Sequence, residues 1–227
     1  MEYFNIAIDG PAGAGKSTIA KLAAKRLGFV YVDTGAMYRS MALYFIRQGI
    51  SPEDEEAIAG ACGQVEVTIR YADGVQQVIL NGEDVSGLIR TEKVGNTASA
   101  TSVYPSVRAH LLELQRSLAA SQNVIMDGRD IGTCILPDAQ AKIYLTASSR
   151  VRAVRRYKEL TEKGTMCNLE EIEQDIIERD HRDMTREIAP LKQAEDAVLL
   201  DSSEMTIDQV VQAIIDTAKA HGLKEKV

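Results

Sequence analysis

Short apolar runs alternate with longer segments of helical periodicity along most of the chain. The runs predict strands at residues 3–8, 29–35, 123–130, 141–147 and 197–203. Between them, apolar residues recur three and four positions apart, which is typical of helices. Helices are expected at residues 16–27, 36–48, 106–120, 149–162, 169–187 and 206–221. Strands that alternate with helices predict an α/β fold of three layers, in which a central parallel sheet is flanked by helices on both faces.

Residues 62–91 follow a different pattern. Apolar and polar side chains alternate strictly in residues 65–71, and a second run with strand character occupies residues 75–80. Asp73 and Gly74 between them form a typical hairpin turn. The sequence therefore predicts a small antiparallel β insert. Because no Pro- or Ser-rich linker borders it, we expect one domain over residues 1–227.

Composition narrows the class of protein. The 227 residues are 45% hydrophobic and 26% charged, which excludes a collagen-like or largely disordered chain. The net charge of −7 argues against a nucleic-acid partner, and the lack of a long apolar run argues against a membrane protein. No coiled-coil seam is evident, so we expect a monomer. The N-terminus has no signal-peptide pattern, and Cys62, Cys134 and Cys167 are scattered, as expected for reduced thiols in the cytoplasm.

Residues 10–17, GPAGAGKS, fit the phosphate-loop pattern G-x-x-x-x-G-K-[ST] in full, with a strand before it and a helix after it. In such a loop, main-chain N–H groups surround a phosphate, the lysine reaches the β- and γ-phosphates and the hydroxyl binds Mg²⁺. The motif therefore predicts binding of a nucleoside triphosphate, but it leaves the reaction open. Its residues are Gly10, Pro11, Ala12, Gly13, Ala14, Gly15, Lys16 and Ser17.

Asp127 is a second candidate for the metal site. It ends the apolar run at residues 124–127 and could hold Mg²⁺, directly or through water, together with Ser17. The alternative is that Asp127 is an ordinary aspartate at the end of a strand. The chain has no N/T-K-x-D motif of the kind that reads guanine, which argues against a GTPase.

Arginine makes up more than half of the 26 cationic residues. Arg39, Arg108 and Arg129 follow predicted turns or begin helices, and two clusters occupy residues 150–158 and 179–186. One interpretation is solvated helix faces with local salt bridges, for which Glu159 and Asp180 are available. The other is neutralisation of several phosphates, since phosphoryl transfer depends mainly on positioning and charge. An acceptor phosphate is already ionised, so no general base is needed.

The spacing of the second cluster suggests that Arg179, Arg182, Asp183 and Arg186 share one helix face.

Seven ordered blocks give the chain a specific resemblance. They are residues 8–18, 33–39, 80–94, 126–133, 142–149, 178–191 and 198–203. Together they resemble the bacterial cytidylate kinases, members of the nucleoside monophosphate kinase group of P-loop kinases. The resemblance implies transfer of the γ-phosphoryl group of MgATP to CMP and dCMP, in pyrimidine nucleotide metabolism. It also implies a core of residues 1–61, 92–148 and 188–227, a monophosphate-binding insert at about 62–91, and a helical lid at about 149–170.

The resemblance further implies the roles of individual residues. Besides the loop, Thr18 and Arg155 would contact ATP. The residues implied in CMP binding are Asp33, Thr34, Arg39, Ser99, Arg108, Arg129, Asp130, Arg179, Asp183 and Arg186. The residues implied in catalysis are Lys16, Arg129, Arg186, Arg152 and Arg156. The Asp183 carboxylate would accept from the cytosine amino group and repel uracil. We therefore expect Arg39, Arg129 and Arg186 to share a cavity with Lys16.

Other functions remain open at this point. The chain could phosphorylate a different small acceptor, such as shikimate or UMP, although the insert and the R-x-x-R-D-x-x-R segment speak against shikimate. It could also be a nucleotide-dependent switch or an RNA-associated binding module, which the acidic net charge disfavours. The effect of Thr34, where the related kinases more often have serine, is open as well.

Overall fold

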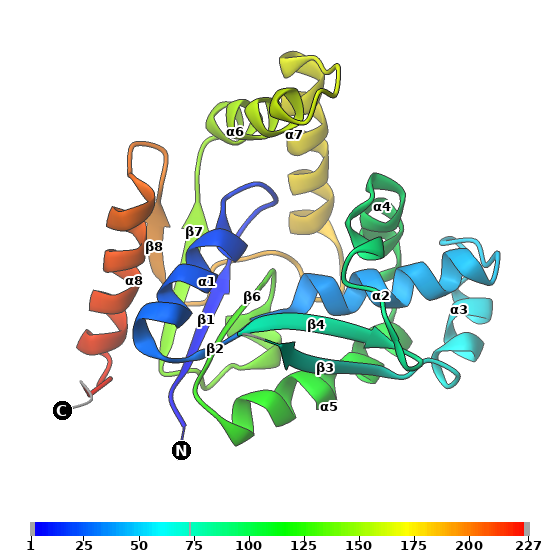
Figure 1. Ribbon diagram of the computed structural model, residues 1–227, viewed down its shortest axis with the longest axis horizontal. Helices are drawn as coiled ribbons and strands as arrows, with labels where there is room; N and C mark the ends of the chain where they lie inside the picture. Colours follow the sequence, from blue (N-terminus) through cyan, green and yellow to red (C-terminus); the bar gives the residue numbers. More distant parts are fainter. Residues whose placement is uncertain (1–2, 73, 225–227) are drawn as a thin grey trace.

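A computed structural model describes residues 3–72 and 74–224 and contains a five-stranded parallel sheet (Figure 1). Its strand order is β2-β6-β1-β7-β8. The bounds are β1 Asn5–Asp9, β2 Val30–Asp33, β6 Val124–Gly128, β7 Ala141–Thr146 and β8 Val198–Asp201. The central strand β1 is buried throughout and pairs with β6 and β7, which explains its continuous apolar character.

Helices cover both faces of this sheet, which confirms the predicted three-layer α/β fold. Helices α1 (Lys16–Leu27) and α8 (Ile207–Ala220) lie on one face, where Ile6 and Ile8 of β1 are buried against them. Ala7 points to the other face and joins a second core with α2 (Thr34–Arg47) and α5 (Pro105–Ser121). The strict two-residue alternation of a strand thus places successive side chains of β1 in two separate cores.

The insert forms an antiparallel sheet beside β2. Strands β3 (Val67–Ala72) and β4 (Val75–Leu80) pair as the sequence predicts, in a register that sets Ala72 opposite Val75. Asp73 of the predicted turn lies outside the described residues. A third strand, β5 (Glu83–Asp84), pairs with the end of β4. It is too short to leave a pattern in the sequence.

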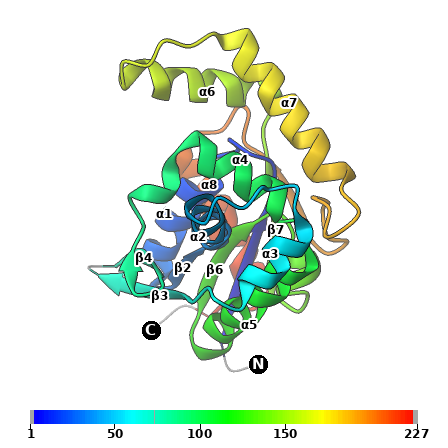
Figure 2. The same ribbon diagram turned by 90° about the vertical axis from the view of Figure 1, so that its right-hand side faces the viewer.

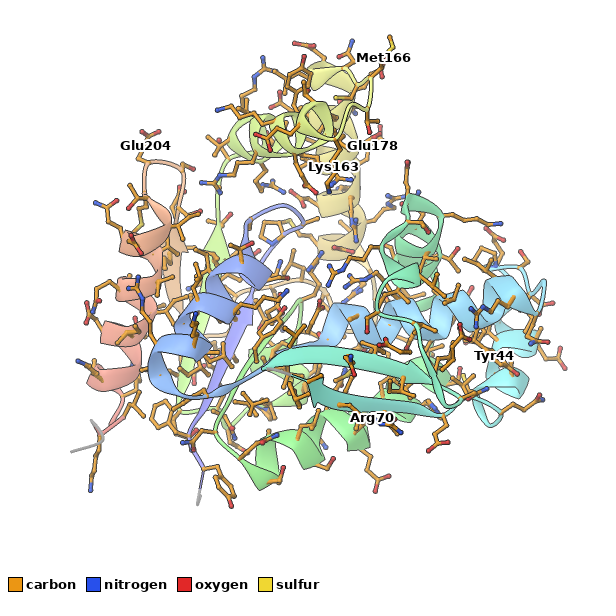
Figure 3. The ribbon with its side chains drawn as sticks, in the orientation of Figure 1. Tyr44, Arg70, Lys163, Met166, Glu178 and Glu204 are labelled. Carbon is orange, nitrogen blue, oxygen red and sulfur yellow. The ribbon has the colours of Figure 1, made fainter. Side chains whose placement is uncertain are left out.

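Helices α6 (Ser149–Glu162) and α7 (Leu169–Thr185) form a hairpin that stands above the loop after β1 in both ribbon views (Figure 2). Ser148 caps α6 and Asn168 caps α7 through their side-chain oxygens. Met166 lies in the connection at the far end of the hairpin and is 98% exposed (Figure 3). The hairpin therefore contacts the rest of the molecule mainly through its other end.

Several predicted boundaries differ from the structure by one or two residues, and two of the differences bear on the site. The strand predicted at residues 29–35 ends at Asp33, because its carboxylate accepts from the Ala36 N–H and starts α2 at Thr34. Helix α7 ends at Thr185 instead of residue 187, and Arg186 has an extended backbone. Arg186 therefore does not continue the helix face that the spacing suggested.

Several short elements were not predicted. They are α3 (Glu55–Cys62), α4 (Glu92–Thr101), a 3₁₀ helix η1 (Leu88–Arg90) and a π-helix η2 (Ile131–Ile135). Helix α4 has few apolar residues and hence no clear stripe, although Thr91 caps its start. Among residues 3–72 and 74–224, no helix combines the length and hydropathy needed to cross a membrane. The three cysteines are free thiols, of which Cys62 is buried and Cys134 exposed.

Candidate active site

The phosphate loop, residues 10–17, connects the end of β1 to the start of α1. At Gly10 a side chain is sterically excluded, because an added Cβ would lie 1.9 Å from the main-chain oxygen of Leu145. Gly13 and Gly15 have positive φ angles of 76° and 84°, which favour glycine. Gly15 is the N-cap of α1 and offers no side-chain cap, so the first N–H groups of the helix remain available to an anion.

The side chain of Lys16 folds back over this loop. Its Nζ donates to the carbonyl oxygens of Gly10 and Pro11, at 2.7 and 2.8 Å. Lys16 is only 6% exposed, and burial together with repulsion from Arg129 lowers its pKa to about 7. A bound phosphate would favour the charged ammonium, since an opposite charge raises the pKa of an amine.

Asp127 lies at the end of β6 directly beside the phosphate loop. Its carboxylate accepts from Ser17 Oγ at 3.0 Å and from the hydroxyl of Tyr31 at 2.8 Å. Burial, with repulsion from Asp33, raises the pKa of Asp127 to about 6. Mg²⁺ prefers oxygen ligands, and a bound cation would stabilise the ionised carboxylate. The Ser17 hydroxyl and the Asp127 carboxylate therefore fit the metal site that the sequence suggested.

Asp9 is a buried carboxylate that the sequence did not single out, although it immediately precedes Gly10. It accepts from the N–H groups of Ile131 and Gly132 at 2.7 and 2.8 Å, so it anchors the π-helix η2 to the end of β1. Burial outweighs these bonds and raises the pKa of Asp9 to about 6. The π-helix follows Asp130 directly, so Asp9 fixes the wall of the site behind that residue.

Arginine and aspartate side chains form ion pairs at the end of the site away from the phosphate loop. Three pairs carry most of the charge: Arg39 with Asp33, Arg108 with Asp130, and Arg129 with Asp183. Arg186 approaches the second pair and donates to Ser102 Oγ at 3.3 Å. The carboxylates hold the guanidinium groups in place, and they limit the repulsion between cations that lie close together.

Two guanidinium groups in this region have an unused donor. The Nε atoms of Arg39 and Arg179 are buried and have no hydrogen-bond partner. Burial and repulsion from Arg129 also lower the pKa of Arg179. Buried donors of this kind are normally satisfied, so an anionic ligand that supplied acceptors would remove an energetic cost.

Asp183 lies among these cations. Burial opposes its ionisation, but Arg129, Arg179 and Arg186 together hold its pKa below the usual value. The Asp183 carboxylate is therefore charged at neutral pH. Arg182, on the same helix, is exposed and does not line the site, so the expected common face of Arg179, Arg182, Asp183 and Arg186 is wrong in that respect.

Three arginines of α6 also line the site. Arg152 is 5% exposed and donates to the Ala12 carbonyl of the phosphate loop at 2.8 Å. Arg155 donates to the Ser202 carbonyl at 2.8 Å. Arg156 pairs with Glu159 one turn along the helix, which is the local salt bridge that the alternative interpretation expected. Only Arg152 is bound to the phosphate loop itself.

These residues surround one cavity of about 780 Å³. Every site residue proposed from the sequence lines it except Gly10 and Pro11, whose carbonyl groups accept from Lys16. Arg39, Arg129 and Arg186 thus share a cavity with Lys16, as expected. Residues that the sequence did not assign also line it, among them Tyr38, Ser102, Ser202, Met205, Thr206 and Ile207. Tyr38 precedes Arg39, and its ring lies 5.8 Å from the Arg108 guanidinium.

Comparison with known proteins adds an independent finding. A sequence model described as cytidylate kinase matches residues 6–220. The cytidylate kinase of Carboxydothermus hydrogenoformans is 47% identical over 211 residues, which cover 93% of this chain and 95% of that protein. The cytidylate kinase of Caldicellulosiruptor bescii is 47% identical over 216 residues, covering 95% of this chain and 96% of that protein.

Solved structures are similar at the level of the fold. A gluconokinase from Sinorhizobium meliloti superposes with a TM-score of 0.50 at 13% identity, covering 96% of this chain and 92% of that one. An uncharacterized protein from Eubacterium ventriosum gives a TM-score of 0.54 at 12% identity, covering 96% and 99% of the two chains. At such low identity, these likenesses establish a shared fold and nothing about the substrate.

Proposed function

The chain belongs to the cytidylate kinase family of enzymes, and from this premise we propose that it transfers the γ-phosphoryl group of MgATP to CMP and dCMP, giving ADP and CDP or dCDP. The phosphate loop, with Thr18 and Arg155, binds the triphosphate of the donor. The main-chain N–H groups at the start of α1 and the ammonium of Lys16 supply the positive charge there.

The acceptor occupies the opposite end of the cavity. Arg39, Arg129 and Arg186 hold its phosphate, and Arg179 adds a donor from α7. A phosphate monoester is ionised at pH 7, so its oxygen can attack without a general base. The protein then accelerates the reaction by aligning two anions and neutralising the charge between them.

The remaining residues of the set recognise the nucleoside. We assign this role to Ser99, Arg108 and Asp183, with Asp33, Thr34 and Asp130 beside them; all line the cavity. The charged carboxylate of Asp183 can accept from the exocyclic amine of cytosine and is repelled by the corresponding oxygen of uracil. The charge that the neighbouring arginines impose on Asp183 therefore supports a preference for cytosine.

Ser17 and Asp127 are proposed to hold Mg²⁺. When bound, this ion neutralises charge on the phosphates of the donor. Asp127 is itself held by Tyr31 at 2.8 Å, so its carboxylate is already oriented by the fold. The ionised form of Asp127 is disfavoured by burial, and a cation at this position would reverse that preference.

The α6–α7 hairpin is proposed to act as the lid at residues 149–170. Arg152 and Arg156 line the cavity from α6 and place their positive charge over the donor end. Closing the hairpin over the cavity would exclude water, which otherwise competes as an acceptor and hydrolyses ATP. The proposed domain therefore has three parts. They are this lid, the monophosphate-binding insert at about residues 62–91, and the core of residues 1–61, 92–148 and 188–227 that connects the other two.

One observation carries the proposal: Arg39, Arg129, Arg179 and Arg186 meet in the same cavity as Lys16, although they come from three separate segments, namely α2, the loop after β6, and α7 with its C-cap. The test is a coupled assay of ADP release with MgATP and each of CMP, dCMP, UMP, AMP and GMP. The expected order places CMP and dCMP first. Strongest activity with AMP or GMP, or nucleotide binding without transfer to any of the five, contradicts the proposal.

We also propose that the enzyme is a cytoplasmic monomer of pyrimidine nucleotide metabolism, with small nucleotides as its partners and no nucleic-acid ligand. The acidic net charge supports the last point, because a broad basic surface is the usual footprint of nucleic-acid binding.

A further inference from the structure

Strand β2 forms one edge of the main sheet, because it pairs with β6 on one side only. The N–H of Val30 donates to Asn123 at the start of that pairing. In a parallel pair, main-chain groups of alternate residues point to the two sides of the strand. Tyr31 and Asp33 therefore direct their main-chain groups to the free edge, where buried polar groups need partners.

Side chains of the insert occupy this edge in place of a sixth strand. The carboxamide of Gln76 on β4 accepts from the Asp33 N–H at 2.8 Å and donates to the Asp33 carbonyl at 3.3 Å. The hydroxyl of Tyr71 on β3 donates to the Tyr31 carbonyl at 3.0 Å. Both bonds of Gln76 are part-buried, and burial raises the pKa of Tyr71 to about 12, so its hydroxyl keeps its proton.

Tyr71 and Gln76 are directly opposite each other in the β3–β4 register, so their side chains project from the same face of the hairpin. Their two targets on β2 are also spaced two residues apart, which matches the repeat of an extended strand. Strands β3 and β4 lie beside β2 in both ribbon views (Figures 1 and 2), and Figure 3 labels Arg70, the residue before Tyr71 on β3. The pair therefore fixes the hairpin to the edge of the sheet in a defined register.

Asp33, which the Gln76 side chain holds, lies at the acceptor end of the cavity. Asp33 caps α2 by accepting from Ala36, and it pairs with Arg39 at 3.2 Å. It also ends the strand that carries Tyr31, whose side chain holds Asp127. A displacement of the Asp33 backbone would move the start of α2 and with it the guanidinium of Arg39.

We propose that Gln76, assisted by Tyr71, is a positioning residue for the acceptor: its carboxamide completes the edge of β2 and holds Asp33 and Arg39 in the orientation that receives the nucleoside monophosphate. This inference rests on the proposed function. It implies that the insert supports the acceptor end of the cavity through Gln76 and Tyr71, although neither side chain lines the cavity.

The test compares Gln76→Met with Gln77→Met. Methionine keeps the length and volume of glutamine but makes neither hydrogen bond. Gln77, the next residue of β4, faces the other side of the hairpin and serves as the matched control. In Gln76→Met we expect the KM for CMP to rise about tenfold, as is typical for the loss of a hydrogen bond, with the KM for MgATP little changed. The Asp33 N–H and carbonyl lose their partner, so the Tm should fall modestly, by about 2–4 °C for each hydrogen bond lost. Tyr71→Phe should shift the KM for CMP in the same direction.

Amide hydrogen exchange at Asp33 gives a second readout that needs no substrate. Its N–H should be protected in the wild type and in Gln77→Met, and should exchange at least about tenfold faster in Gln76→Met. Unchanged exchange at Asp33 overturns the inference, as does faster exchange with no change in the KM for CMP. A fall of Tm accompanied by a lower kcat and by an equal rise of the KM for CMP and for MgATP also overturns it, since that is the result of a purely structural role. If the wild type fails to phosphorylate CMP while exchange responds as expected, the proposed function fails and the anchoring of Asp33 stands.

Discussion

The guanidinium of Arg152 on α6 forms a buried ion pair with Asp180 on α7. The same guanidinium donates to the Ala12 carbonyl of the phosphate loop and to the Ala147 carbonyl at the end of β7. Asp180 immediately follows Arg179, which lines the cavity. One ion pair therefore connects the helix that bears proposed acceptor-binding residues to the loop proposed to bind the donor.

Replacing Asp180 with Asn should weaken the donor site. Arg152 would stay in a buried position but lose its partner carboxylate, so its hold on the phosphate loop would loosen. We expect the KM for MgATP to rise about tenfold, with a smaller change in the KM for CMP. Steady-state kinetics with each substrate varied in turn provide the measurement. Asp175→Asn, at an exposed position of the same helix, is the control and should behave as the wild type.

Lys16→Ala should abolish turnover and preserve the fold. The substitution removes the ammonium group proposed to contact the transferred phosphoryl group, for which a loss of at least about a thousandfold in kcat is expected. The lysine is buried with a lowered pKa, so its removal also relieves a desolvation cost. Circular dichroism should show an unchanged secondary structure. Retention of more than a tenth of the wild-type rate would contradict the role given to Lys16.

Arg179→Met should weaken the binding of CMP without lowering the stability of the folded protein. The guanidinium is buried among like charges and leaves Nε without a partner, so the folded protein without ligand gains little from it. We expect the Kd for CMP to rise at least about tenfold, while the Tm stays equal or increases. Calorimetric titration and thermal unfolding measure the two quantities. Arg182→Met, on the exposed side of the helix, is the control; equal loss of CMP affinity in both variants would refute the assignment.

Asp183→Ala should reduce the preference for cytosine. Without the carboxylate, the amino group of CMP loses an acceptor and the oxygen of UMP is no longer repelled. We expect the ratio of kcat/KM for CMP to that for UMP to fall at least about tenfold. The far-UV spectrum should stay that of the wild type. Because Asp183 also accepts from Arg129 Nε at 2.9 Å, activity on both substrates should fall as well. An unchanged ratio would show that another residue reads the base.

Asp9 should make stability depend on pH in the absence of ligands. Its pKa is raised from 3.8 to about 6 by burial, so the folded protein retains a proton that the unfolded chain releases. The stabilisation from this group is complete below pH 3.8 and is lost as the pH rises through 6; its full size is roughly 3 kcal/mol.

Asp9→Asn removes this titration. The free energy of unfolding of the wild type should therefore increase relative to the variant as the pH falls from 7 to 4. Urea unfolding of both proteins across this range, without nucleotide or Mg²⁺, measures the difference. A difference that stays constant with pH would mean that Asp9 is ionised equally in the folded and unfolded states.

The features that the sequence revealed are local ones. A phosphate loop is defined by eight consecutive residues, and the alternation of apolar runs with amphipathic segments reports which faces must be buried. Both were sufficient for the three-layer fold, for the β insert and for one end of the cavity. The resemblance to a kinase family added residues at the other end, and the structure brings those residues to the same cavity.

Boundaries and short elements were less predictable, because capping and neighbouring segments decide them. Helix α4 has no apolar stripe, and the early end of β2 depends on one bond of the Asp33 carboxylate. The π-helix at residues 131–135 depends on Asp9, which is more than 120 residues away in the chain. No pattern within the segment itself indicates such a partner.

The sequence by itself determined which chemical groups are available: a glycine loop with its lysine, and more arginines than lysines. Only the tertiary structure decided which carboxylate each arginine faces, as in the pairing of Arg129 with Asp183 across 54 residues of chain. It also decided that Gln76 completes the edge of β2. The physical reason is that hydrogen bonds and ion pairs depend on distance and direction in space, and the folding of the chain sets both.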